Sequence, residues 1–152
     1  MRIKNVITLL LSAVILVVMS ACASRPTHLD LEIRSSSEIN LDSDNVSSPL
    51  MLNFYELDSA EQFSKLDYWT LLDNGKDRLN SDLISQNKHI ILPSEEQHYK
   101  IIFNEKAKFL GIIGNFRKLD SNATWRCVIS LDNKTHNSVD LEINEYQIKE
   151  IE

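Results

Sequence analysis

Apolar and polar residues alternate along much of this chain, which is the pattern of strands that bury one face. Residues 29–34 alternate without exception, and residues 50–57 place Leu50, Leu52 and Phe54 on a common face. Because successive side chains of a strand point to opposite faces, this period of two predicts half-buried strands.

The same alternation returns in the second half of the chain. It predicts further strands at residues 89–92, 98–104, 109–117, 125–131 and 139–143. Gly111 and Gly114 indicate a bulge or a close approach of the backbone to another group. Tyr146 and Ile148 fall out of phase with the last strand, which indicates a bulge there. Cys127 lies on an apolar face, where we expect an inert, buried thiol.

Residues 58–86 break the alternation. Ser59 and Gln62 have the spacing of a capping box, and Gly75 stands where a helix commonly ends. Apolar residues recur here at helical spacing, and we expect them in the core: Phe63, Leu66, Trp69 and Leu72. We therefore predict a small helical insertion at about residues 58–86, packed on an edge or a face of a sheet.

Seven or eight short strands with one helical insertion predict a mainly β protein, a β-sandwich. We expect one folded domain, residues 29–152, without internal repeats or a linker. The chain has 152 residues and a formal net charge of −6. This acidic balance disfavours nucleic-acid binding, which needs lysine and arginine against phosphate.

The first residues have the pattern of a secretory signal peptide. Arg2 and Lys4 precede a nearly unbroken apolar run at residues 6–19, which is short for a helix that spans a bilayer. Two small residues then stand directly before Cys22, which resembles the cleavage box of bacterial lipoproteins. The alternative is an ordinary cleaved signal peptide with a cysteine there by chance.

The lipoprotein resemblance implies that residues 1–21 are removed and that Cys22 carries lipid on its sulfur and on its new amine. Residues 22–28 then form a tether. Since each buried methylene contributes about 0.8 kcal/mol, three acyl chains hold a protein firmly. Ala23, rather than Asp, follows the cysteine. The resemblance therefore implies anchoring in the inner leaflet of the outer membrane, with the domain facing the periplasm.

The sequence offers no pattern of catalytic or metal-binding residues. No two of the four histidines have metal-ligand spacing: His28, His89, His98 and His136. Three glycines cannot build a glycine-rich phosphate loop, and no Gly-x-Ser-x-Gly elbow occurs. We expect no enzyme activity, no metal and no cofactor beyond the covalent lipid on Cys22. A Ser-His-Asp triad assembled in space remains an open alternative.

An ordered set of short pieces resembles the TssJ family, the outer-membrane lipoproteins of the type VI secretion system. The pieces are Pro49, Phe54-Tyr55-Glu56-Leu57, Phe63, Asp67-Tyr68-Trp69-Thr70-Leu71, Leu92-Pro93-Ser94-Glu95, Leu110-Gly111, Phe116-Arg117 and Trp125-Arg126. The chain departs from the family at Ser94, which replaces a turn glycine, and in the loop before Pro49, which lacks the usual Asn-Pro and Gly-Arg pieces. We find no match after Leu131.

This resemblance implies a transthyretin-like β-sandwich and a structural adaptor that binds the periplasmic C-terminal region of TssM and tethers it to the outer membrane. It also implies that the loop between the first two strands, residues 35–49, contacts TssM. The candidate contact residues are Ser36, Ile39, Asn40, Leu41, Asp42, Val46 and Pro49.

A stable interface buries about 1,200–2,000 Å² in total, so we expect neighbouring strand or loop surface to contribute. Arg117 and Arg126 are interpreted as framework residues that orient turns. The alternatives are a periplasmic lipoprotein that binds a small ligand or inhibits an envelope enzyme, and a lipoprotein hydrolase.

Overall fold

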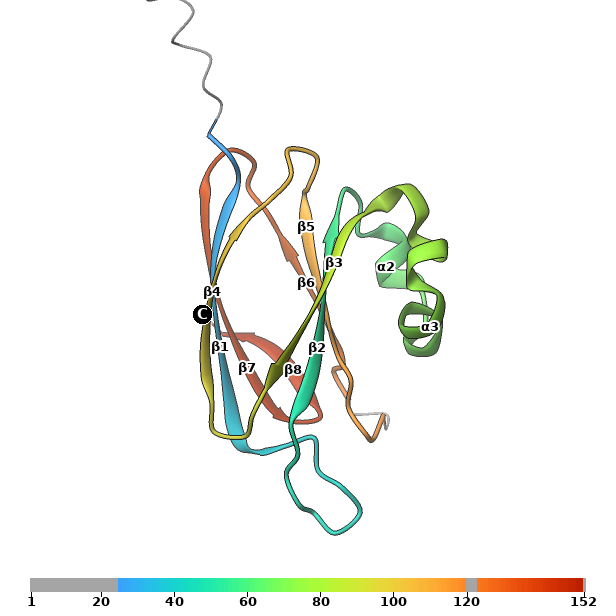
Figure 1. Cartoon of the computed structure of the whole chain (residues 1–152), viewed down its shortest axis with the longest axis vertical. Coiled ribbons are helices and arrows are strands. Elements are labelled where there is room, and N and C mark those ends of the chain that lie inside the picture. The colour runs from blue at the N-terminus through green and yellow to red at the C-terminus, as the bar shows by residue number, and fades with distance from the viewer. Residues whose placement is uncertain (1–24, 120–122, 152) are drawn as a thin grey trace, which may run out of the picture.

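Two four-stranded sheets pack face to face in the computed structural model, which describes residues 25–119 and 123–151 (Figure 1). The strands are β1 (His28–Ile39), β2 (Leu50–Leu57), β3 (Leu83–Ile91), β4 (Glu96–Ile102), β5 (Phe109–Gly114), β6 (Arg126–Ser130), β7 (His136–Glu145) and β8 (Gln147–Ile151). The first sheet has the order β4-β1-β7-β8 and the second β3-β2-β5-β6. The predicted β-sandwich is therefore confirmed. The signal peptide, the cleavage box and Cys22 lie outside the described residues.

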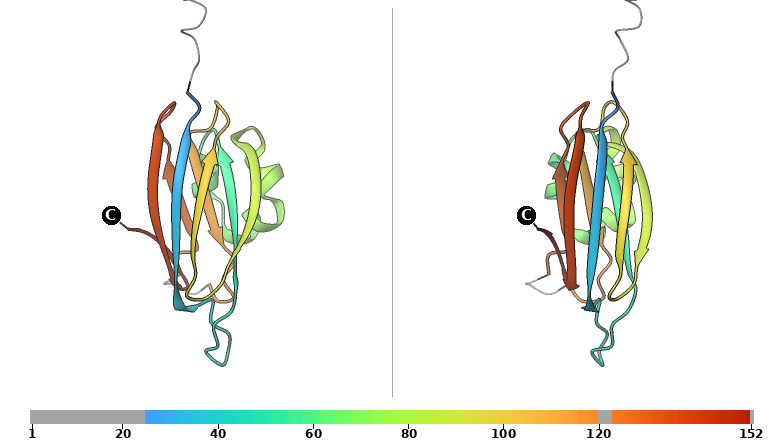
Figure 2. Two further views of the ribbon diagram at one scale, coloured as in Figure 1. Left: turned by 60° about the vertical axis from the view of Figure 1, so that its left-hand side comes forward. Right: turned by 90° about the vertical axis from the view of Figure 1, so that its left-hand side faces the viewer.

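The alternating apolar residues meet between the two sheets, as their spacing predicts. Leu50, Leu52 and Phe54 all face this core, as do Leu110 and Ile112 of the neighbouring strand β5. The first sheet supplies the opposing side chains: Leu29, Leu31, Ile33, Leu141 and Ile143. The opposite face of the first sheet is polar, and the views of Figure 2 show helices beside the second sheet only.

β1 lies at the centre of the first sheet and is longer than the alternation predicts. It pairs antiparallel with β4 and parallel with β7, a neighbour far away in sequence. The expected loop at residues 35–49 is partly wrong, because β1 continues to Ile39 after a register shift between Ser35 and Ile39. The connection to β2 therefore comprises residues 40–49.

Two other boundaries differ from the prediction for local reasons. β3 begins at Leu83 instead of residue 89, since its polar residues 85–88 belong to an edge strand that is solvated along one side. The phase change at Tyr146 is a tight hairpin between β7 and β8, with Asn144 opposite Gln147, and the predicted bulge is wrong.

The helical insertion covers the outer face of the second sheet. It consists of α2 (Glu61–Lys65), α3 (Tyr68–Leu79) and the 3₁₀ turn η2 (Asn80–Asp82) (Figure 1). Phe63 and Leu71 pack there against Tyr55 and Ile113 of the sheet. Burial raises the pKa of Tyr55 to about 12, with a smaller contribution from Tyr68.

Two details of the insertion contradict the sequence prediction. Ser59 is not the N-cap of α2, which is Ala60, and its Oγ accepts from the Glu61 N–H at 3.3 Å instead of from Gln62. Asp67 caps α3 by accepting a 3.0 Å bond from the Thr70 N–H. Trp69 is exposed and not part of the core. α3 extends to Leu79, but two helical pieces meet in it at a kink at Asn74, next to the Gly75 where the sequence predicts a helix end.

Gly111 allows the insertion to sit close to the sheet. A Cβ added at this position would lie 2.6 Å from Cζ of Phe63, closer than atoms of packed side chains approach. Arg126 also binds α2: its Nη1 donates to the carbonyls of Phe63 at 2.7 Å and of Leu66 at 2.9 Å. These bonds satisfy carbonyls at the end of α2 and confirm a framework role for Arg126.

We expect Gly111→Ala to destabilise the domain, since the new methyl group must displace the Phe63 ring. The expected loss is about 1–3 kcal/mol of unfolding free energy, as for other overpacked cores. Gly75→Ala is the matched control: its Cβ would lie 3.6 Å from Tyr55 Cε1, an ordinary contact, so the variant should gain about 0.5–1 kcal/mol of helix stability. Urea unfolding measures both, and equal stability of the two variants would contradict the packing argument.

Candidate interaction site

The loop of residues 40–49 projects from the end of the sandwich opposite the start of β1 (Figure 1). It connects the two sheets, since it leaves β1 of the first sheet and enters β2 of the second. Most of the residues predicted to contact a partner lie in this loop. The hydrogen bonds that hold the loop therefore decide which of their side chains are exposed.

Asn40 fixes the base of this loop. Its backbone N–H donates to the Glu145 carbonyl at 2.8 Å, and its side-chain Nδ2 donates to the Pro49 carbonyl at 2.8 Å. Its Oδ1 accepts from the Arg117 N–H, also at 2.8 Å. Asn40 has φ = 48°, a conformation that asparagine adopts more readily than most residues. The buried Asn40 thus ties the two ends of the loop together and joins the loop to the segment after β5 and to the end of β7.

The tip of the loop is closed by Asp42. Its Oδ1 accepts from the N–H groups of Asp44 and Val46, both at 2.9 Å, and its own N–H donates to the Val46 carbonyl at 3.0 Å. The bond from Val46 is the main reason why the pKa of Asp42 lies below its usual value; the Asp44 N–H and the charges of Arg117 and Lys118 add to it. These bonds fix the shape of an otherwise exposed turn.

The structure divides the predicted contact residues into buried, exposed and half-buried ones. The side chains of Ile39, Asn40 and Leu41 are buried within this chain, so we correct the expectation that they face a partner. Val46 is 58% exposed and Pro49 is exposed as well. Two further candidates are half-buried: Ser36 and Asp42. The available part of the predicted site is therefore the turn around Val46 and its junction with β2.

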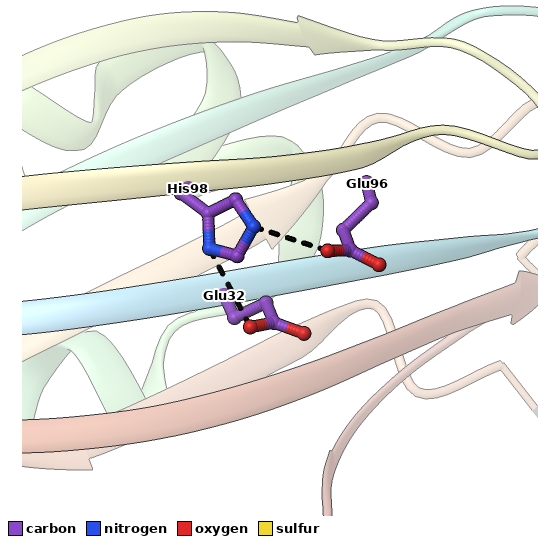
Figure 3. A group of neighbouring side chains, drawn as sticks. All are labelled: Glu32, Glu96 and His98. Atoms are coloured by element: carbon purple, nitrogen blue, oxygen red, sulfur yellow. Dashed lines mark hydrogen bonds and ion pairs between the residues drawn. The ribbon is translucent and has the colours of Figure 1, made fainter.

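Among the described residues, one group of three could hold a metal ion: Glu32, Glu96 and His98. No spacing pattern along the chain predicts this group. Glu32 and His98 are opposite each other on β1 and β4. His98 Nδ1 lies 3.4 Å from Glu32 Oε2, and Nε2 lies 3.0 Å from Glu96 Oε1 (Figure 3).

Arg34 argues against a metal at this group. Its Nε lies 3.5 Å from Glu96 Oε2, and its Nη2 contacts Glu32 and lies 3.8 Å from Asp140 Oδ2. The guanidinium therefore already supplies the positive charge that a metal would bring. We interpret the cluster as an exposed ion-pair network across β4, β1 and β7.

The two long sides of the sandwich are closed differently. On one side, main-chain bonds join the sheets, as the Ile148 N–H donates to the Thr124 carbonyl at 2.8 Å. On the other side, side chains cross the gap between β3 and β4: Gln97 Nε2 donates to the Ile90 carbonyl at 3.0 Å. A partly open hollow of about 310 Å³ lies in this gap, and its lining includes Phe54.

His89 and Cys127 both have pKa values shifted by burial. The His89 ring packs between Phe54 and Tyr99, with ring centroids 4.5 and 4.8 Å away, and burial lowers its pKa. Burial raises the pKa of the Cys127 thiol to about 11, with smaller effects from Glu150 and the Val128 N–H. A thiol with this pKa is protonated at neutral pH, which agrees with the inert cysteine predicted from the alternation.

The comparisons with known proteins identify the class of this protein. A family model described as "Type VI secretion lipoprotein, VasD, EvfM, TssJ, VC_A0113" matches residues 27–146. The chain therefore belongs to the TssJ family of type VI secretion lipoproteins, as the short pieces in the sequence predicted. This is a family of structural lipoproteins of a secretion system and not a known enzyme family. A search among curated proteins finds no match.

Solved structures share the fold. TssJ1 from Pseudomonas aeruginosa is 28% identical with a TM-score of 0.79, over 83% of this chain and 95% of that chain. Lip from Serratia marcescens, described as a membrane bound component of the type VI secretion system, is 16% identical with a TM-score of 0.77, over 84% and 97%. A chain in a structure titled "T6SS protein TssM C-terminal domain (869-1107) from EAEC" is 22% identical with a TM-score of 0.69, over 83% and 98%.

The described residues contain no helix that is both long and apolar enough to cross a membrane. The family name, which describes lipoproteins, implies a lipid anchor.

We expect the domain to lose stability as the pH falls below about 6.5, partly because of His89. An unfolded chain binds a proton at this histidine near pH 6.5, whereas the folded chain, with its lowered pKa, binds it only at lower pH. The unfolded state therefore binds more protons in this window, and acid favours it. Urea unfolding at pH 7.5 and pH 5.0 should show a smaller acid loss in both His89→Phe and His89→Gln. An undiminished loss in both variants would exclude His89 as a source.

Proposed function

We propose that this protein is the outer-membrane adaptor of a type VI secretion membrane complex, and that it binds the periplasmic C-terminal region of TssM. The observation that carries the proposal is the position of the loop at residues 40–49. The loop has a fixed base and carries the exposed Val46 at its tip, and it lies at the end of the domain farthest from the start of β1.

Geometry explains how such an adaptor works. The proposed lipid site, Cys22, precedes β1 by six residues, and β1 is twelve residues long. At about 3.3 Å per residue, β1 places the loop roughly 40 Å from its own first residue. A lipid at Cys22 holds one end of the domain at the outer membrane, while the loop faces the periplasm and a partner that comes from the inner membrane.

The fold of the relatives supports the choice of TssM. A chain of this fold occurs in the structure whose title names the TssM C-terminal domain, and the family itself belongs to type VI secretion. The exposed Val46 at the loop tip offers the kind of apolar contact that becomes buried at an interface. The hydrogen bonds of Asp42 reduce the conformational entropy that the turn would lose on binding.

The binding experiment uses the domain from Ala23 onwards, which contains every core residue from Leu29 to Ile148. Calorimetry with the periplasmic C-terminal region of TssM from the same secretion cluster should detect a one-to-one complex. Val46→Asp should weaken binding at least tenfold, because it places a charge in the contact. Ile102→Asp is the control, since Ile102 is 67% exposed but lies at the other end of the sandwich, where it pairs with His28.

Neither substitution should change the melting temperature appreciably, as both side chains are exposed. Absence of any complex with the unaltered domain would overturn the choice of TssM. If a complex forms and Val46→Asp binds as tightly as the unaltered domain, the loop assignment is wrong.

The lipid anchor is tested separately in cells. Cys22→Ser removes the proposed lipid attachment, so the protein should no longer incorporate labelled palmitate and should leave the outer-membrane fraction for the soluble periplasm. Type VI secretion should be lost at the same time, although the purified domain should still bind TssM. Secretion that survives this change of location would show that tethering is not the function.

A further inference from the structure

A compact apolar surface lies beside the proposed loop, on the outer face of the second sheet. It consists of Met51, Ile90 and Leu92, which are 36%, 56% and 50% exposed, together with the exposed Pro49. We call these four residues the apolar block. Isolated exposed apolar residues are ordinary on a protein surface, whereas contiguous ones commonly mark interaction sites.

The strand register shows that the block is contiguous. Met51 and Ile90 are direct cross-strand partners on β2 and β3. Leu50 pairs with Ile91, so Pro49 and Leu92 come next at the end of the same ladder. Met51 and Ile90 therefore lie side by side on the outer face, and Pro49 and Leu92 are the exposed apolar residues that directly flank this end of the two strands.

The helical insertion leaves this part of the sheet uncovered. Its buried side chains pack on Tyr55, Leu57 and Ile113, at the part of the sheet farther from the loop. In Figure 1, α2 and α3 lie beside the upper and middle part of the second sheet, while the loop projects below it. Met51 belongs to neither buried cluster.

The proposed lipid anchor at Cys22 lies away from the block. Only two residues lie between Cys22 and Arg25, and the domain is entered at the end opposite the block. The part of the chain that the structure describes leaves the four residues of the block exposed, so we look for the occupant of the block in another molecule.

We propose that the apolar block is a second contact surface for TssM, continuous with the loop; this inference rests on the proposed function. One turn around Val46 is too small for a stable interface, which needs about 800 Å² on each partner. The block adds apolar surface next to Pro49, where the loop enters β2. Lys88 is exposed, lies two residues before Ile90 and borders the block on the same face. The block and Lys88 together favour a partner surface with apolar side chains and a carboxylate at its edge.

The test compares substitutions that suit a strand equally well. The double variant Met51→Thr with Ile90→Thr keeps good strand residues but removes the apolar surface. It should bind the TssM region at least tenfold more weakly, with an unchanged melting temperature. Ile102→Thr, also on an exposed strand position, is the control and should bind within twofold of the unaltered domain. Lys88→Glu should weaken binding more at low salt than at high salt.

The possible results distinguish failure of this inference from failure of the proposed function. If Val46→Asp weakens binding while the block variant binds normally, the block is not part of the interface and the proposed function still stands. If the unaltered domain does not bind TssM, both proposals fail. Sedimentation of the domain alone adds a third outcome: self-association that disappears in the block variant, with TssM binding unaffected, would show that the block joins two copies of this chain and would overturn the inference.

Discussion

The bonds of Asn40 determine how the loop is held, and the candidate interaction surface depends on them. This one side chain bonds the entrance of β2 and the segment after β5, while its backbone bonds the end of β7. A buried amide that satisfies both a donor and an acceptor is costly to replace, because any apolar substitute leaves the Pro49 carbonyl and the Arg117 N–H without partners. The loop is thus part of the folded domain, and only its tip and its junction with β2 are available for recognition.

The alternation of apolar residues was sufficient to predict most strands, because each strand of the sandwich buries one face. It failed where that condition fails. β3 is an edge strand with polar residues at 85–88, so its first residues were predicted to belong to the helical insertion. The same limit explains Ile39 and Leu41: their irregular spacing resembles an exposed contact loop, although tertiary packing buries both. Burial of this kind depends on neighbours that are distant in sequence, such as the parallel strand β7.

The sequence predicts where the candidate site lies along the chain, but it does not predict which of the site's side chains are exposed. The family resemblance placed it between the first two strands, whereas the choice of available residues needed the fold. The apolar block joins β2 to β3, so its residues come from segments almost 40 residues apart, and only the register between them makes the surface visible. The ion-pair network around His98 likewise arises from the pairing of β1 with β4.

The central position of β1 has a mechanical consequence. The chain enters the domain at the first residue of this strand, and the loop leaves from its last. Any tension between a membrane anchor and a partner on the loop therefore runs along β1 itself. Hydrogen bonds to β4 on one side and β7 on the other lie across that direction, so the load shears two ladders at once instead of opening bonds one by one. A domain arranged in this way can transmit force without unravelling from its tethered end.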